Sequence, residues 1–133
     1  TSHKIPRLSF QFCYNGQDVS DALWLNLGSY ITFGSASSLT NLSASSPPLP
    51  TLFIGGGEYD VIGIDHTTLT DANYPSRFGV ETRFEAFTTN TSRPLATNPD
   101  VVWEVTFWND NTIQIATKFD SWAPGALFYM SDG

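Results

Sequence analysis

The stretch WEVTFWNDNTIQIATKF, from Trp103 to Phe119, places two runs of alternating apolar residues on either side of the polar segment Asn109–Asn111. Apolar residues at every second position are typical of a β-strand with one buried face, and two such runs around Asn and Asp predict a hairpin. Its register depends on the loop length, because a shift of one residue moves every side chain to the opposite face.

A three-residue loop, Asn109-Asp110-Asn111, separates the hairpin into an apolar and a polar face, whereas a two-residue loop mixes the two kinds on both faces. Asn111 also suits the left-handed backbone conformation that the longer loop requires. The sequence therefore predicts that Trp103 is buried and that Trp108 faces outward beside the turn. The expected apolar face holds Val101, Trp103, Val105, Phe107, Ile113, Ile115, Thr117 and Phe119. The expected polar face holds Val102, Glu104, Thr106, Trp108, Thr112, Gln114, Ala116 and Lys118.

The rest of the chain is also typical of strands. It holds two lysines and four glutamates among many Ser, Thr, Asn and aromatic residues, which is a poor composition for helix surfaces. The sequence predicts an all-β fold: a single-domain antiparallel β-sandwich or jelly roll of about eight or nine short strands, covering residues 1–133. Further strands are expected within 8–14, 22–27, 29–35, 51–65 and 76–89, with a turn at Asn15-Gly16 and a long surface connection over 35–50. The predicted core includes Phe10, Phe12, Leu25, Phe84, Trp103, Val105 and Ile115.

The charge of the chain restricts its partners. A net charge of −7 disfavours nucleic acid and anionic membrane surfaces, and no apolar run reaches the roughly 20 residues needed to cross a bilayer. The single cysteine, Cys13, excludes an intramolecular disulfide. A start at Thr1 without a basic and apolar leader suggests a processed product. The sequons at Asn41 and Asn90 fit a secreted or extracellular setting, and a cytoplasmic one stays open.

Three stretches are candidate binding sites. An outward tryptophan beside short amide and carboxylate side chains suits a sugar subsite, although such a tryptophan can also simply cover a sheet edge. The segment 65–77 is expected to be a polar loop between two strands, and binding residues are often carried on such loops. The third stretch, FDSWAPG, follows the hairpin at its opposite end. The candidate residues are Trp108, Asn109, Asp110 and Asn111; Asp65, His66, Asp71, Asn73, Tyr74 and Arg77; and Asp120 and Trp122.

Catalytic and metal chemistry have weaker support in the sequence. Asp65 and His66 are adjacent, so in a strand their side chains point apart. Glu58 and Asp60 share one face of a strand and are the best carboxylate pair for a glycosidase. The glycine-rich IGGGEYD lacks the lysine and helix of a phosphate loop, and no Cys and His residues have zinc spacing. We therefore expect no cofactor and no catalytic residue. Calcium stays open, because Asp65 and Asp71 could be joined by carbonyl oxygens in one loop, although no Asp-x-Asp-x-Asp-Gly series is present.

The functional interpretation is a non-catalytic, lectin-like domain that binds glycans through aromatic and Asn/Asp side chains. A structural or assembly domain, such as a fibre head, is the alternative, and a small hydrolase acting on glycans is the third. A homo-oligomer is expected, because shallow sugar sites gain avidity when several copies are linked.

Overall fold

The computed structural model describes residues 2–26, 30–36, 51–53, 59–88, 98–120 and 129–131. All regular secondary structure in these ranges is β, and every paired strand is antiparallel, which confirms the predicted fold class. The strands are β1 (His3–Lys4), β2 (Cys13–Tyr14), β3 (Gln17–Asp18), β4 (Leu23–Asn26), β5 (Tyr30–Phe33), β6 (Thr51–Phe53), β7 (Tyr59–Asp71), β8 (Tyr74–Thr88), β9 (Val101–Trp108), β10 (Ile113–Phe119) and β11 (Tyr129–Ser131).

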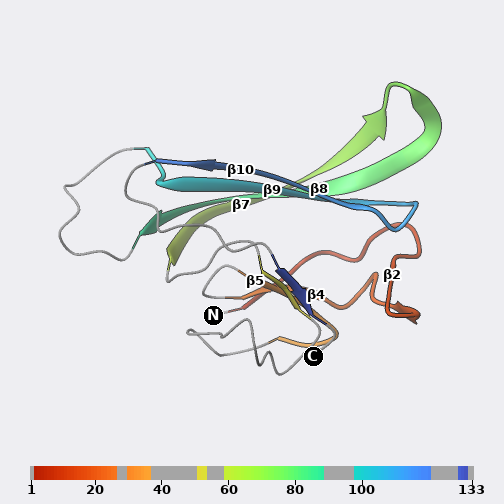
Figure 1. The fold of residues 1–133 in the computed structure, drawn as a ribbon, viewed down its shortest axis with the longest axis horizontal. Coiled ribbons are helices and arrows are strands. Elements are labelled where there is room, and N and C mark those ends of the chain that lie inside the picture. The colour runs from red at the N-terminus through yellow and green to blue at the C-terminus, as the bar shows by residue number, and fades with distance from the viewer. Residues whose placement is uncertain are drawn as a thin grey trace.

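Two larger sheets form two layers, as Figure 1 shows. One sheet has the strand order β1-β4-β5-β6-β11, the other has the order β10-β9-β8-β7, and β2 and β3 form a separate small hairpin. A single cluster of buried apolar side chains contains residues of both sheets, including Leu25 and Ile31 from one and Phe84 and Trp103 from the other. The two layers therefore pack against each other around a shared core.

The register of the β9–β10 hairpin is the predicted one. Ile113 lies opposite Phe107, Ile115 opposite Val105 and Thr117 opposite Trp103. Hydrogen bonds close the three-residue loop: the Trp108 N–H donates to the carbonyl oxygen of Thr112 at 2.9 Å, and the Asn111 N–H donates to that of Trp108 at 3.0 Å. Asn111 has the expected left-handed conformation, with φ of 65°.

Most of the predicted core residues are buried. Phe12, Leu25, Phe84, Trp103 and Val105 are each at most 2% exposed.

The other two predicted core residues, Phe10 and Ile115, are only partly buried against the core. Ile115 lies on β10, which has a paired strand on one side only. Phe10 belongs to a segment, 8–12, that was predicted to be a strand and is not one. Backbone hydrogen bonds hold that segment at its two ends, from Leu8 N–H to the Ser20 carbonyl and from Val19 N–H to the Phe12 carbonyl.

The turn at Asn15-Gly16 is confirmed. Both residues have positive φ, 52° and 74°, and they join Tyr14 to Gln17 between β2 and β3. Asn and Gly adopt this conformation with little strain, so these two residues determine the hairpin locally.

The predicted polar loop over 65–77 is wrong. This segment continues the two longest strands of the molecule, β7 with 13 residues and β8 with 15, and only Ala72 and Asn73 lie between them. Threonines at positions 67, 68 and 70 favour extended backbone, which explains why a polar segment forms strands. Short strands are predicted, and β7 and β8 are longer than expected.

The outward face of the four-stranded sheet carries the charged residues of β8 and β9. Arg83 forms ion pairs with Glu85 and with Glu104, the second at 3.7 Å, as expected for a charged and partly solvated face. Glu81 lies on the same face, and burial together with the nearby Glu104 carboxylate raises its pKa.

Candidate functional site

Trp108 lies on the predicted face, opposite the core, but it is not exposed. Only 6% of its surface is accessible, which corrects the expectation of an outward stacking platform. Gly79 lies opposite Trp108 on β8, and a Cβ atom there would approach the indole Cε3 to 2.9 Å, so the ring occupies the space that a side chain would need. The indole N–H donates to Gln114 Oε1 at 3.1 Å.

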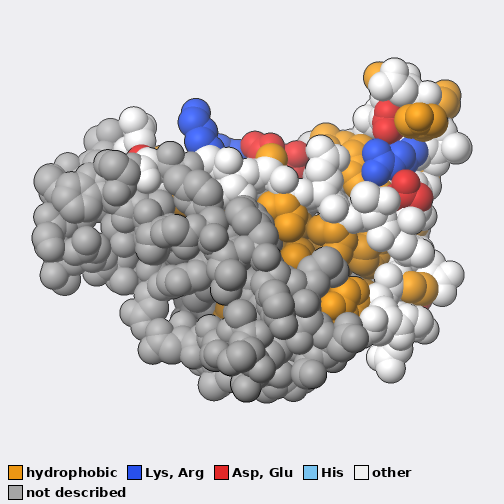
Figure 2. Space-filling model, viewed as in Figure 1, with side chains coloured by type: hydrophobic (Ala, Val, Ile, Leu, Met, Phe, Trp, Pro, Cys, Tyr) orange, Lys and Arg blue, Asp and Glu red, His pale blue; other side chains and the backbone are white. Residues whose placement is uncertain are grey.

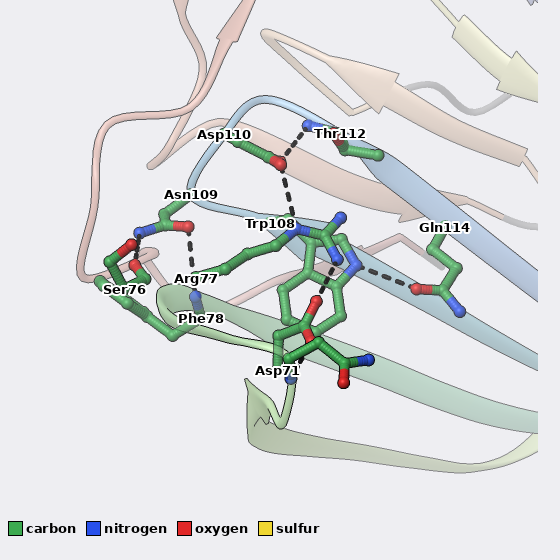
Figure 3. Close-up of polar contacts among 10 residues, drawn as sticks. Asp71, Ser76, Arg77, Phe78, Trp108, Asn109, Asp110, Thr112 and Gln114 are labelled. Carbon is green, nitrogen blue, oxygen red and sulfur yellow. Dashed lines mark hydrogen bonds and ion pairs between the residues drawn. The ribbon is translucent and has the colours of Figure 1, made fainter.

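The Arg77 guanidinium covers the other side of the indole, as Figure 3 shows, with its central carbon 4.0 Å from the ring centroid. Two carboxylates hold it there. Nη1 lies 3.0 Å from Asp71 Oδ2, and Nε lies 2.9 Å from Asp110 Oδ2. Arginine suits this position because its planar group can stack on an aromatic ring while its edges donate hydrogen bonds.

The Asn109 side chain joins the β9–β10 loop to β8. Its Nδ2 donates to the carbonyl oxygen of Ser76 at 3.0 Å, and its Oδ1 accepts the N–H of Phe78 at 3.2 Å. Asn109 thus pairs the carbonyl of Ser76 and the N–H of Phe78, the backbone groups on either side of Arg77. The β7–β8 register shifts at this point, between Thr70 and Asp71. The amide of Asn109 therefore has a structural role in fixing the position of Arg77.

A surface pocket of about 490 Å³ lies beside this network and is lined by Tyr74, Ser76, Arg77, Asn109 and Asp110. Tyr74 is 64% exposed. The end of the β7–β8 hairpin runs beyond the last residue paired with β9 and rises from the sheet on the side away from the other layer, at the right of Figure 1. Figure 2 shows basic atoms between acidic ones at the base of this hairpin. The pocket therefore lies where the two hairpin ends meet.

Both carboxyl groups of the network are held in the ionised form. The pKa of Asp71 is lowered, mainly by the backbone N–H of Asn73 and then by Arg77. The pKa of Asp110 is also lowered, mainly by the side chain of Thr112, with further contributions from its N–H and from Arg77. Two carboxylates and one guanidinium leave a local charge of −1. Because their pKa values are lowered, neither carboxyl is suited to act as a general acid near neutral pH.

The structure thus brings together residues from two of the three predicted stretches. Tyr74 and Arg77 come from β8, Asn109 and Asp110 come from the β9–β10 loop, and Asp71 supports Arg77.

The remaining candidates lie elsewhere or have other contacts. Asn73 donates its N–H to Asp71 within the turn, and Asn111 Oδ1 accepts the N–H of Cys13 at 3.0 Å. Asp65 is exposed opposite Arg83 on the outward face, and the His66 ring contacts His3.

Asp120 lines a separate pocket of about 420 Å³ at the far end of the β9–β10 hairpin, with Asn98, Pro99, Asp100, Val102 and Lys118. It therefore does not join the Tyr74 pocket. Trp122, Glu58, the two sequons and residues 37–50 of the expected connection lie outside the described residues.

Three residues of the site are not among those predicted from the sequence. Ser76 contributes to the pocket, while Gly79 and Gln114 determine the burial of Trp108. Gly79 carried a usable signal, because a glycine inside an alternating strand often marks close approach of another group. Gln114 could be predicted less directly as a partner of Trp108, because the two residues share the polar face of the hairpin.

In the described part of the chain, no three His, Cys, Asp or Glu side chains are grouped so that they could hold a metal ion. The same residues include no helix that is long and apolar enough to span a membrane.

Comparison of the chain with protein-family models, with curated proteins and with solved structures finds no match. The pocket beside Tyr74 must therefore be interpreted from its own chemistry.

Proposed function

We propose that the chain is a non-catalytic carbohydrate-binding domain and that its site is the pocket beside Tyr74. The observation that carries this proposal is the convergence of an exposed tyrosine ring, a serine hydroxyl and a carboxylate–guanidinium pair on one pocket of about 490 Å³. Small-molecule sites of this kind combine an apolar surface with a few fixed polar groups.

Tyr74 replaces Trp108 as the stacking residue in this proposal. A tyrosine ring presents a flat apolar face to the C–H face of a sugar, and its hydroxyl can donate or accept a hydrogen bond. Asp110 offers acceptor sites to sugar hydroxyls, and its side chain is 48% exposed. Ser76 adds a hydroxyl beside it.

The charges of the site favour an uncharged sugar. Asp71 and Asp110 together outweigh Arg77, and the Nη1 and Nε atoms of the guanidinium each already contact a carboxylate. A sialic or uronic acid would bring another negative charge to this position, which costs free energy. Neutral sugar hydroxyls can instead share the donors and acceptors of the ion pairs.

The test compares Tyr74→Ala with Tyr74→Phe by calorimetric titration of neutral glycans first identified on a glycan array. Tyr74→Ala should weaken binding by about 1 to 3 kcal/mol, because a hot-spot aromatic is lost from an exposed position. Tyr74→Phe keeps the ring and should retain most of the affinity, while both variants should melt near the parent temperature. An array without any binding, or equal affinities of Tyr74→Ala and the parent, would contradict the proposal.

One observation favours the alternative of an assembly domain. The exposed large apolar side chains in the described residues are Tyr74 and Ile62, which is 51% exposed, and both lie on the β7–β8 hairpin. If they contact another copy of the chain, Tyr74→Ala and Ile62→Ser should each shift the assembly toward the 14.6 kDa monomer in light scattering. A sugar site predicts that Ile62→Ser leaves glycan affinity unchanged.

A further inference from the structure

The two histidines of the chain meet between the two sheets. His3 lies on β1 and His66 on β7, which are edge strands of their respective sheets among the described residues. Their Nε2 atoms are 3.2 Å apart, while the ring centroids are 5.5 Å apart in planes that differ by 11°. The planes are nearly parallel, but the centroid separation equals the Nε2 separation plus the radii of both rings, so the rings meet tip to tip and do not overlap face to face.

A hydrogen bond of this geometry requires one protonated and one unprotonated Nε2 atom. A neutral imidazole has one N–H donor and one acceptor nitrogen, so two neutral rings satisfy the requirement. The Nδ1 atom of His66 lies 3.0 Å from the hydroxyl oxygen of the buried Thr82. If this Nδ1 accepts the threonine proton, His66 donates to His3; if it donates, His66 accepts from His3.

We propose that the His3–His66 contact is a proton-sensitive clasp, which joins the edges of the two sheets and opens when both rings are protonated. One added proton leaves the bond in place, since an imidazolium N–H can donate to the remaining neutral ring. A second proton removes the only acceptor and places two positive charges at the contact.

The protonation of His66 depends on the charged groups around the clasp. Burial is the main cause that lowers the pKa of His66 from 6.5, the charge of His3 adds to it, and the neighbouring Asp65 opposes it. Lys4, next to His3, is paired with Asp21 at 2.6 Å. Arg83 lies opposite Asp65 across β7 and β8, and it is itself paired with Glu85.

The sign of the effect on stability follows from the direction of this shift. A histidine with a lowered pKa binds fewer protons in the folded chain than in the unfolded chain. Its stabilisation is therefore complete above about pH 6.5 and is lost as the pH falls through the lower value of the folded state. The Asp carboxyls with lowered pKa values lose their contribution only below about pH 4, and the raised pKa of Glu81 acts with the opposite sign. The histidine effect is therefore identified from the difference between the parent and the histidine variants.

The experiment measures chemical denaturation at steps between about pH 7.5 and pH 5 for the parent, His3→Gln, His66→Gln and the double variant. In the parent, the folding equilibrium should weaken by up to about tenfold per pH unit for each extra proton bound by the unfolded chain. Either single variant should reduce this dependence, and the double variant should resemble the single ones because the clasp needs both rings. Lys4→Gln is the matched control and should keep the dependence of the parent.

A second measurement does not depend on whether the variants fold. In the parent, hydrogen exchange at β1 and β7 should accelerate over the pH range in which the imidazole resonances of His66 report its protonation, beyond the intrinsic change with pH. Hydrogen exchange at β1 and β7 that follows only the intrinsic change with pH, or an unchanged pH dependence of stability in both single variants, would each overturn the clasp.

Discussion

Two tryptophans on the same strand, Trp103 and Trp108, are buried in different ways. Trp103 faces the core and stacks on Phe84 with ring centroids 4.7 Å apart, among side chains that are almost all apolar. Trp108 faces the other side of the sheet and is covered by one cation, which two carboxylates hold in place. Burial of the first depends on the packing of two layers, whereas burial of the second depends on the absence of a side chain at Gly79 and on a few polar side chains.

The largest loss of stability is expected from a substitution of Trp103, on the core face of β9. Trp103→Ala should lower the free energy of unfolding by about 3 to 5 kcal/mol, because the cavity is closed in by both sheets and cannot refill with water favourably. Denaturant titration measures this change. A loss close to that of an exposed residue would mean that the two layers do not pack as described.

The next largest loss of stability is expected from a substitution of Trp108, on the polar face of β9. Trp108→Ala should cost about 3 kcal/mol, since a buried ring is removed although one of its faces is covered only by Arg77. Trp108→Phe is the matched variant, and it keeps the aromatic surface while losing the hydrogen bond to Gln114. If Trp108→Ala changed glycan affinity but left the melting temperature unaltered, Trp108 would be a ligand contact. The buried position described for its ring would then be wrong.

A smaller effect is expected from filling the space beneath that ring. Gly79→Ala should destabilise the fold by about 1 to 3 kcal/mol, because its Cβ would lie 2.7 Å from the Phe107 carbonyl oxygen and 2.9 Å from the indole. Gly63→Ala on the neighbouring strand is the control, since the nearest atom to its Cβ would be Glu85 Oε2 at 4.0 Å. Equal melting temperatures of the two variants would contradict this account of Trp108.

The smallest effect is expected from Arg77→Lys. Lysine keeps the charge, but it has no planar fork with which to contact both Asp71 and Asp110. The indole of Trp108 should therefore become more accessible to water, and tryptophan fluorescence should shift to longer wavelength. Unaltered fluorescence would show that Arg77 does not shield the ring.

The same substitution should alter acid unfolding. The pKa values of Asp71 and Asp110 are lowered in the folded chain, so the stability they contribute is present above about pH 4 and is lost as the pH falls through the lowered values. With weaker contacts to residue 77 these pKa values should rise toward normal, and the acid limb of the stability curve should become shallower. An identical acid limb in the parent and in Arg77→Lys would indicate that the backbone and Thr112 contacts alone set the shifts.

Local patterns in the sequence were sufficient for the β9–β10 hairpin and for the Asn15-Gly16 turn. In both, the loop residues have the backbone conformations that their chemistry favours, and alternation fixes which face is apolar. The long β7–β8 hairpin does not follow from the sequence in the same way, because its polar residues predict a loop. No side chain between Asp65 and Arg77 is fully buried, so the extended form of this segment depends on the pairing of β7 with β8 and not on a buried face.

The sequence alone determined the strand composition, the register around Asn109–Asn111 and the burial of Trp103, because these follow from side-chain alternation between near neighbours. The burial of Trp108 was decided only by the tertiary structure. It depends on Gly79, which lies 29 positions away and opposite the indole, and on Arg77, whose place is set by Asp71 and Asp110 from two different hairpins. The meeting of His3 with His66 is of the same kind, since residues 63 positions apart become neighbours only when the two sheets pack together.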